Sequence, residues 1–292
     1  MFTEYFTKLK GYFLSIDYRR LIPLVFVTLL LILSYTYRQC QYITPYLQIS
    51  LDKTKNSSVQ LSNSQLTKII VISHFNEDLN WLALYIGDKI PYIIYTRSSD
   101  SLINHAIPLN KGREAVAYLR YIVDHYSNLP SLVAFIHGHR NAWHQTDPSD
   151  IVVALRALRW NKYGYMPLTS TMTFAFFHEN SADIQSKVNF QLWRDVLQKE
   201  LGPPPRGGIK GHCCASFVAR KEEILKHPKK FYSSIIDYII ASQFSDQLTG
   251  RTLEYTWHMI FGQPAIVHFR KCDIFYCDDK GVISVKLAEK HQ

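Results

Sequence analysis

Residues 131–144, S-L-V-A-F-I-H-G-H-R-N-A-W-H, contain the strand on which the predicted fold depends. The run from Leu132 to Ile136 is apolar and lies between Pro130 and Gly138, which is typical of a strand buried on both faces of a parallel sheet. The polar residues after it would follow the carboxyl end of this strand, where open α/β sheets bind their ligands. The stretch therefore predicts a central strand and the beginning of a functional site.

Three histidines, His137, His139 and His144, lie within eight residues of this stretch. Imidazole can ligate a metal, transfer a proton or, when protonated, hydrogen-bond a phosphate. We expect His137 and His139 to share one side of the strand end, because alternate strand residues face the same way. A metal site built from all three histidines is the narrower hypothesis. Histidines that only cap the strand end and bond to loop backbone are the simpler alternative.

Patterns elsewhere in the chain predict an α/β domain with a mixed, mostly parallel sheet flanked by helices. Continuous β-branched and apolar runs indicate strands, and apolar residues at helical spacing indicate helices. Segment 171–177 is interpreted as either a strand or an aromatic loop. We expect strands at 68–73, 91–96, 132–136, 211–220, 265–269 and 274–277, and helices at 78–86, 112–126, 147–160, 181–201, 228–241 and around 254–258.

An uncharged apolar run at 21–35 reaches the short end of the length needed for a transmembrane helix when it is extended by a few residues. Basic residues precede the run and only Arg38 follows it closely, so the positive-inside rule keeps the amino terminus cytosolic. A signal peptide and a buried core helix are the alternatives. We therefore predict a cytosolic tail at 1–20, a transmembrane anchor at 21–38, a stem at 39–67, a luminal domain at 68–280 and a tail at 281–292.

Charge and cysteine content narrow the choice of partners and compartment. The formal net charge of +9 favours phosphate-bearing partners, but the basic residues are scattered, which argues against nucleic acid. In a luminal domain, Cys213, Cys214, Cys272 and Cys277 would meet oxidising conditions, and one or two disulfides are expected. Their pairing stays open, although the last two could close their own loop.

One polar cluster follows the first strand, and a second opens the helix at 112–126. In the first, His74, Asn76 and Glu77 end a buried strand, as at the start of many nucleotide-binding domains; a helix cap is the alternative. The second is a glycine between basic residues at a helix start, which is a ready phosphate-binding geometry, although glycines at helix starts are common. Its members are Lys111, Gly112, Arg113 and Glu114.

Glu254 and His258 are four residues apart and therefore neighbours on one helical face. A carboxylate beside an imidazole is a plausible general-base pair, which makes these two the candidate catalytic residues. An ordinary surface pair, or a buried histidine held by a glutamate, is the alternative.

Five stretches together carry a resemblance to a known family. They are H-F-N-E-D-L-N-W-L at 74–82, G-R-E-A-V-A-Y-L at 112–119, F-I-H-G-H at 135–139, C-C-A-S-F at 213–217 and L-E-Y-T-W-H-M-I-F-G at 253–262. The ordered set, spanning about 68–265, resembles an uncharacterised domain-of-unknown-function family that is similar to GT-A-fold glycosyltransferases. The run at 110–119 also looks like the N-x-G-R-D segment of rhamnan-synthesis-type transferases.

The resemblance implies a nucleotide-sugar donor bound above the sheet and a divalent cation, Mn²⁺ or Mg²⁺, at its diphosphate. The Asp-x-Asp metal motif of GT-A enzymes is absent, however, and His137-Gly138-His139 stands in its place. Hard cations prefer carboxylates, so Lys111, Arg113 and Arg140 would neutralise the diphosphate instead.

The leading hypothesis is a type II, single-pass membrane glycosyltransferase of the Golgi or endoplasmic reticulum that acts on a glycan or other hydroxyl acceptor. In it, the clusters at 74–77 and 111–114, with His137, His139 and Arg140, hold the donor, and Glu254 with His258 deprotonates the acceptor. A metal-dependent hydrolase using His137, His139 and His144 is the second hypothesis. A non-catalytic luminal binding protein of the same fold is the third.

Overall fold

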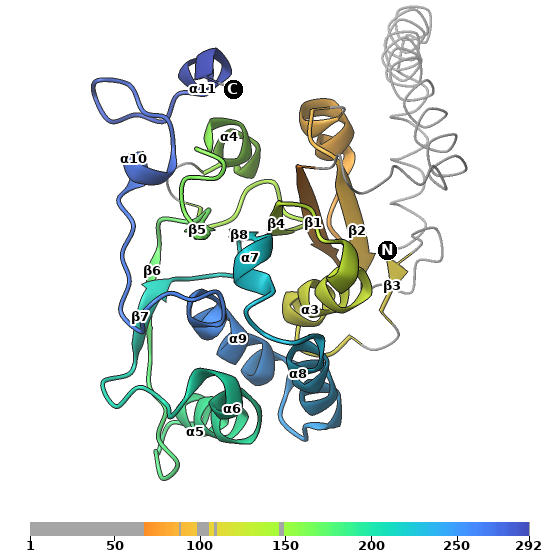
Figure 1. Cartoon of the computed structure of the whole chain (residues 1–292), viewed down its shortest axis with the longest axis vertical. Coiled ribbons are helices and arrows are strands. Elements are labelled where there is room, and N and C mark those ends of the chain that lie inside the picture. Colours follow the sequence, from red (N-terminus) through yellow and green to blue (C-terminus); the bar gives the residue numbers. More distant parts are fainter. Residues whose placement is uncertain (1–66, 88, 98–104, 108–109, 146–148, 292) are drawn as a thin grey trace, which may run out of the picture. The chain divides into compact units, whose positions relative to one another are not determined.

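The structure, a computed structural model, describes residues 67–87, 89–97, 105–107, 110–145 and 149–291. Its main sheet has six strands in the order β3-β2-β1-β4-β8-β5 (Figure 1). The first four run parallel, and β8 runs antiparallel to both of its neighbours. The predicted mixed, mostly parallel sheet is thereby confirmed. Its strands are β1 (Lys68–His74), β2 (Tyr92–Thr96), β3 (His105–Ala106), β4 (Leu132–His137), β5 (Tyr165–Pro167) and β8 (Phe217–Arg220).

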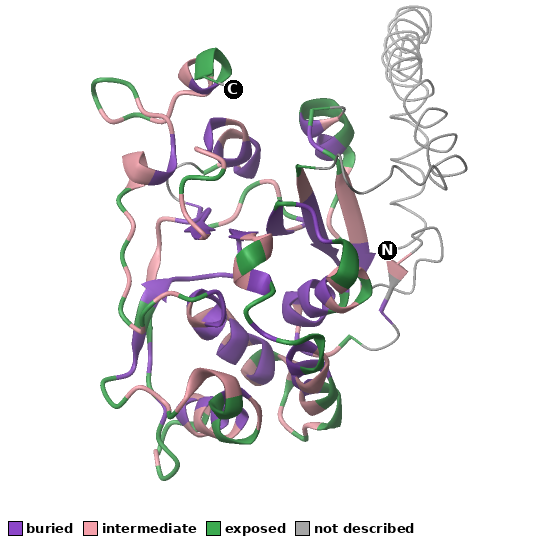
Figure 2. Cartoon of the chain, in the orientation of Figure 1, coloured by how far each residue is buried: buried purple, intermediate pink, exposed green. Residues whose placement is uncertain are grey.

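The central strand β4 is buried on both faces, as its sequence predicts. Val133 and Phe135 belong to one core and Ala134 and Ile136 to the other, and all four are fully buried. Such alternation follows from the two-residue repeat of a strand, which turns successive side chains to opposite faces. Burial colouring shows the centre of the sheet inaccessible from either side (Figure 2).

Helices cover both faces of the sheet and make a three-layer arrangement. The core that contains Phe135 packs against α3 (Glu114–His125), α8 (Lys229–Ala241) and α9 (Asp246–Ile260). The opposite core is covered by the short π-helix η1 (Leu82–Ile86) and by α4 (Ile151–Ala157). Further short helices include η2 (Tyr126–Asn128), α7 (Lys221–Ile224) and α10 (Lys271–Ile274).

A second, two-stranded sheet lies beside α9 and consists of β6 (Met172–Ala175) and β7 (Ile209–His212). The central part of segment 171–177 is therefore a strand rather than a loop. Between β6 and β7 runs one nearly continuous helical stretch, as predicted for 181–201, made of α5 (Ile184–Leu192), a π-helical turn η3 (Trp193–Leu197) and α6 (Gln198–Leu201). Asp183 caps its start by accepting the backbone N–H groups of Gln185 and Ser186.

Three predicted strands are wrong in detail. Segment 211–220 forms two strands in different sheets, because the backbone turns sharply at Cys214 and Ala215, where φ is +76° and +48°. Segment 265–269 makes backbone-to-backbone hydrogen bonds with β7 at Lys210, and the Phe269 N–H donates to the His212 ring instead of continuing the ladder. Segment 274–277 is drawn into a loop by a disulfide between Cys272 and Cys277, so only isolated bridges remain there.

The helix predicted for 147–160 is shorter, and its first two residues, 147 and 148, lie outside the described residues. Asp150 is the cap of α4, and its carboxylate accepts the backbone N–H of Val152 at 2.8 Å. The segment expected as a tail from 281 contains helix α11 (Val285–His291), which packs on α4 through the fully buried Ala288. The folded unit therefore continues past residue 280.

The predicted cytosolic tail, membrane anchor and stem fall outside the described residues, apart from the last residue of the stem, Thr67. Within the part of the chain that the structure describes, none of the helices combines the length and apolar character needed to cross a bilayer.

Phe135→Ala tests the central strand. Phe135 is fully buried and contacts the rings of Tyr118 and Phe217, with centroids 5.1 and 5.2 Å away. We expect the free energy of unfolding to fall by about 3–5 kcal/mol, because the substitution removes buried surface and leaves a cavity. Urea titration measures the change. Phe174→Ala is the control, since Phe174 is 47% exposed and its loss should cost under about 0.5 kcal/mol. Equal losses would contradict the assignment.

Candidate functional site

The carboxyl ends of β1, β2 and β4 meet at one edge of the sheet. Ser73 and His137 are paired in the register of β1 and β4, and the His74 Nδ1 atom lies 3.0 Å from the Thr96 hydroxyl at the end of β2. The chain leaves β1 toward β2 on one side, while β4 lies on the other, so the crevice between β1 and β4 is the switch point of the sheet. Ligands of open α/β sheets bind at such a point.

Five ionisable side chains gather at this edge, and we name them the buried charge cluster. Arg113 Nη1 lies 3.7 Å from Glu254 Oε1, and the Glu114 side chain is 4% exposed. Electrostatic interactions link Glu254 with Glu114 and His137, and link Glu114 with Arg97. The cluster thus brings together residues that are far apart in the chain: Arg97, Arg113, Glu114, His137 and Glu254.

Glu254 is the member best suited to move a proton. Burial, together with the nearby Glu114 carboxyl, raises the pKa of Glu254 to about 7, although His137 and Arg113 act in the opposite direction. Burial likewise raises the pKa of Glu114. A carboxyl group whose pKa lies near neutrality is present in both protonation states at physiological pH, which is the property a general base needs.

His137 is held in one tautomer by a turn that contains a disulfide between the neighbours Cys213 and Cys214. Its Nε2 atom lies 2.7 Å from the Cys214 carbonyl and must donate a proton to it. Burial lowers the pKa of His137, so the neutral ring keeps Nδ1 as its unprotonated nitrogen. The carbonyl groups of Cys213 and Ala215 also accept side-chain hydroxyl groups, so three successive carbonyls of the turn accept hydrogen bonds from side chains.

Several buried polar atoms at this edge have no hydrogen-bond partner among the described residues. Native proteins rarely leave such atoms unpaired, and a ligand is a common reason for finding them together. They lie at the ends of β1 and β2, at the start of α3, after β4 and before β8: Ser73 Oγ, Arg97 Nε, Glu114 Oε1, His144 Nε2, Gln145 Oε1 and Ser216 Oγ.

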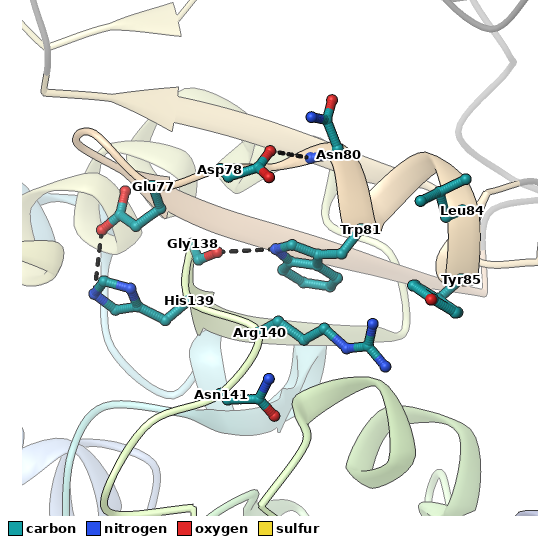
Figure 3. A pocket seen from close by; sticks show the side chains of 10 residues that line it. All are labelled: Glu77, Asp78, Asn80, Trp81, Leu84, Tyr85, Gly138, His139, Arg140 and Asn141. Carbon is teal, nitrogen blue, oxygen red and sulfur yellow. Dashed lines mark hydrogen bonds and ion pairs between the residues drawn. The ribbon is translucent and has the colours of Figure 1, made fainter. Parts of the chain in front are cut away.

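An open cavity of about 460 Å³ lies at the switch point, and we name it the β1–β4 hollow (Figure 3). The indole N–H of Trp81 donates to the Gly138 carbonyl at 3.0 Å and so ties the segment after β1 to the end of β4. Glu77 Oε1 faces His139 Nε2 at 3.5 Å. The lining residues are Glu77, Asp78, Asn80, Trp81, Leu84, Tyr85, Gly138, His139, Arg140 and Asn141.

Glu77 connects the hollow with the buried charge cluster. It lines the hollow, and it also acts electrostatically on His137. The pKa of Glu77 is lowered although burial opposes the shift, because the backbone N–H groups of Phe75 and Glu77 and the nearby His139 and His74 favour its carboxylate. Glu77 is thus a fixed negative charge between the two parts of the site.

Two residues predicted to approach a phosphate instead have packing roles. The Lys111 ammonium donates to the carbonyls of Ser242 and Phe244 at 2.7 and 3.3 Å. At Gly112, φ is +68°, and a Cβ atom would lie 2.7 Å from Cγ2 of Ile239 on α8. Glycine is therefore needed there for backbone conformation and close helix packing.

The start of α3 is already occupied by a carboxylate of the protein. The backbone N–H of Arg113 donates to Asp246 Oδ1 at 2.8 Å, so the position predicted for a phosphate carries an acidic side chain from α9. The side chains of Arg113 and Glu114 still join the site through the buried charge cluster.

The other predicted donor-site residues differ in whether their side chains are already bonded within the protein. Arg140 donates from Nη2 and Nε to Asp150 Oδ2 at 2.6 and 3.0 Å, and its guanidinium lies 4.0 Å from the centre of the Tyr85 ring. Its charge is therefore neutralised within the protein. His139 is exposed beside Glu77, and Asn76 is exposed in the turn after β1.

His258 does not pair with Glu254 in the described structure. Its ring packs against Gly211, where a Cβ atom would lie 2.9 Å from the ring, and its Nε2 atom faces the Ala265 carbonyl at 3.4 Å. Burial lowers the pKa of His258 to about 4, which leaves the ring neutral. The predicted Glu254–His258 base pair is thus replaced by Glu254 with Glu114, Arg113 and His137.

A metal centre does not fit the described residues. They contain no group of three or more His, Cys, Asp or Glu side chains placed to hold a metal ion. The His137 ring lies 6.5 Å from that of His139 and 5.6 Å from that of His144, and its Nε2 atom is already bonded to a carbonyl. Neither the histidine metal site nor a Mn²⁺ or Mg²⁺ site in place of an Asp-x-Asp motif is supported.

Arg97, Trp81, Tyr85 and Asn141 are site residues that the sequence interpretation missed. Arg97 directly follows the predicted strand at 91–96, so the rule that placed His137 at a strand end applies equally to it. Asn141 carries the same signal, since it lies in the polar run after the strand predicted at 132–136. Trp81 and Tyr85 lack such a signal, because their place depends on how η1 packs beside β4.

Fold and site together define an α/β protein with a cluster of polar and ionisable side chains at the carboxyl edge of a mostly parallel sheet. The chain belongs to the family described as "Protein of unknown function (DUF3431)", whose model matches residues 69–278. The expected membership of an uncharacterised family is thereby confirmed. No curated protein and no solved structure matches the chain.

Glu254→Gln tests the burial of the Glu254 carboxyl. Its pKa rises from an ordinary 4.5 to about 7 on folding, so the folded protein binds the proton more tightly than the unfolded chain. Stability is therefore lost as pH rises through this range, and glutamine removes that loss. Relative to the native protein, the variant should gain roughly 3 kcal/mol between pH 4 and pH 8. Urea titrations at both pH values measure it, with the exposed Glu222→Gln as control. Parallel pH curves would refute the prediction.

Replacing Cys213 and Cys214 together with alanine tests the turn that holds His137. Without the disulfide, the two residues with positive φ can relax, and the Cys214 carbonyl should move away from His137 Nε2. ¹⁵N NMR of histidine-labelled protein should show one fixed tautomer in the native protein and a mixture in the variant. The matched control replaces Cys272 in α10 and Cys277 in the loop after it, which form the other disulfide. An unchanged His137 signal in the first variant would contradict the assignment.

Proposed function

We propose that this chain is a glycosyltransferase that moves a sugar from a nucleotide-sugar donor to a hydroxyl acceptor. The observation that carries the proposal is Glu254, a buried carboxyl with a pKa of about 7 at the carboxyl edge of the sheet. Arg113 lies beside it, and Arg97 acts on the neighbouring Glu114. A base at this pKa can take a hydroxyl proton near neutrality, and the arginines suit a phosphate-bearing leaving group.

In the proposed reaction, Glu254 accepts the proton of the acceptor hydroxyl as its oxygen bonds to the anomeric carbon of the donor sugar. The bond from that carbon to the phosphate oxygen breaks, and the nucleoside diphosphate leaves with the electron pair. Arg97, whose Nε atom has no partner within the described residues, and Arg113 stabilise the charge of the leaving group. His137 offers Nδ1 as a hydrogen-bond acceptor.

Because the described residues do not fit a divalent cation, the proposed mechanism relies on these arginines for charge neutralisation. The same finding disfavours the histidine-based metal hydrolase.

The proposal also includes a GT-A-like fold and a location in the lumen of the secretory pathway. The order β3-β2-β1-β4-β8-β5, with one antiparallel strand and a switch point between β1 and β4, is consistent with a GT-A-like nucleotide-sugar domain. The apolar run at 21–35 supports a type II anchor that places this domain in the lumen of the secretory pathway.

Nucleotide binding tests the proposal. Calorimetry on the full-length chain, kept in a detergent without a sugar headgroup, is carried out with UDP, GDP and CMP and their sugar conjugates. We expect one nucleotide to bind, and Arg97→Met and Arg113→Met each to weaken it about 10- to 100-fold, because each removes a charge-assisted contact. Arg120→Met on the exposed face of α3 is the control.

Turnover separates an enzyme from a binding protein. Glu254→Gln should retain nucleotide binding and lose about 10²- to 10⁴-fold in the rate of sugar transfer or donor hydrolysis. Failure of every nucleotide to bind, or an equal loss in Arg120→Met, would refute the transferase. Binding without any Glu254-dependent turnover would leave the non-catalytic alternative in its place.

A further inference from the structure

The β1–β4 hollow differs chemically from the buried charge cluster beside it. Its acidic side chains are Glu77 and Asp78, and its one permanent cation, Arg140, is already paired with Asp150. A phosphate in the hollow would therefore meet two carboxylates and no free permanent charge of opposite sign among the described lining residues. Two like charges at contact distance repel each other and weaken binding even where water screens them strongly. The hollow is unsuited to the diphosphate of a donor.

The lining suits an uncharged group that carries many hydroxyls. Hydroxyl groups can donate to the carboxylates of Glu77 and Asp78 and accept from the side-chain amide of Asn141. Leu84 and Tyr85, which are 63% and 42% exposed, offer apolar surface to the C–H faces of such a group. The cavity of about 460 Å³ lies within the range of small-molecule sites.

The hollow also has a direction. Glu77 and His139 lie at one end in Figure 3, and Leu84 and Tyr85 lie at the other. The Glu77 end adjoins the buried charge cluster, because Glu77 and Glu254 both act on His137. A ligand held with its hydroxyls toward Glu77 would thus present them to the proposed base.

We infer that the β1–β4 hollow is the acceptor subsite and that it takes a neutral, hydroxyl-rich group of the size of one or two pyranose units. The inference rests on the proposed function, since it assumes that the phosphate-bearing donor lies on the Arg97 and Arg113 side of Glu77. Asn141 and Tyr85 are specificity-determining residues in this assignment.

Saturation-transfer NMR on the full-length chain, in the same sugar-free detergent, tests the inference. The probes are the methyl glycosides of glucose, galactose, mannose, xylose and N-acetylglucosamine, with glucose 6-phosphate as an anionic probe of similar size. We expect at least one neutral glycoside to bind and glucose 6-phosphate to bind more weakly. Asn141→Leu should weaken the bound glycoside about tenfold. Asn128→Leu, an exposed asparagine before β4, should leave it unchanged.

Competition with UDP and GDP separates this inference from the transferase proposal. Glycoside binding that survives saturation with the nucleotide supports an acceptor subsite. Displacement of the glycoside by the nucleotide, tighter binding of glucose 6-phosphate, or equal effects of Asn141→Leu and Asn128→Leu would overturn the inference. If a nucleotide binds and no glycoside does, the acceptor subsite alone fails. If a glycoside binds and no nucleotide does, the hollow is a sugar site and the transferase fails.

Discussion

The parallel pairing of β1 with β4 is the constraint on which the rest of the structure depends. It aligns Ser73 with His137, so both strands end at the same level and the segments after them face each other across one crevice. The indole of Trp81 bonds the end of β4, and Glu77 from the turn after β1 faces His139. Slipping this register by one residue would exchange the buried faces of β4, because side chains alternate along a strand. Core and site are therefore set by the same ladder of hydrogen bonds.

The buried charge cluster is costly for the fold. Carboxyl groups removed from water favour their neutral form, and two of them near each other do so more strongly. Glu114 Oε1 and Arg97 Nε also lack hydrogen-bond partners within the described residues. The aromatic core beneath the cluster, around Phe135 and Trp257, offsets that cost. Groups that destabilise the fold are commonly retained where selection acts on a functional site rather than on stability.

The strands at the centre of the sheet could be predicted from the sequence because a buried strand must be apolar throughout. The rule that ligands bind past strand ends then led to His74, Glu77 and His137. In the structure, His137 is an electrostatic neighbour of Glu254, so two separately predicted residues lie in the same cluster. Roles that depend on distant partners could not be predicted. Gly112 is needed because of its contact with Ile239, and His258 packs beside Gly211. In both cases the partner is distant in the sequence, so the local sequence does not predict the contact. The strands expected after residue 264 failed for the same reason, since a strand exists only where a partner continues beside it.

The disulfide between Cys213 and Cys214 closes a ring that contains no other residue, so it restricts the unfolded chain very little. Its effect is confined to the turn that orients His137. Consider one batch of this polypeptide made in an oxidising compartment and one made in a reducing cytosol. The presence or absence of this disulfide would change neither the circular dichroism spectrum nor the melting temperature appreciably. The two batches would still differ in the turn that bonds His137, and thiol titration would distinguish them.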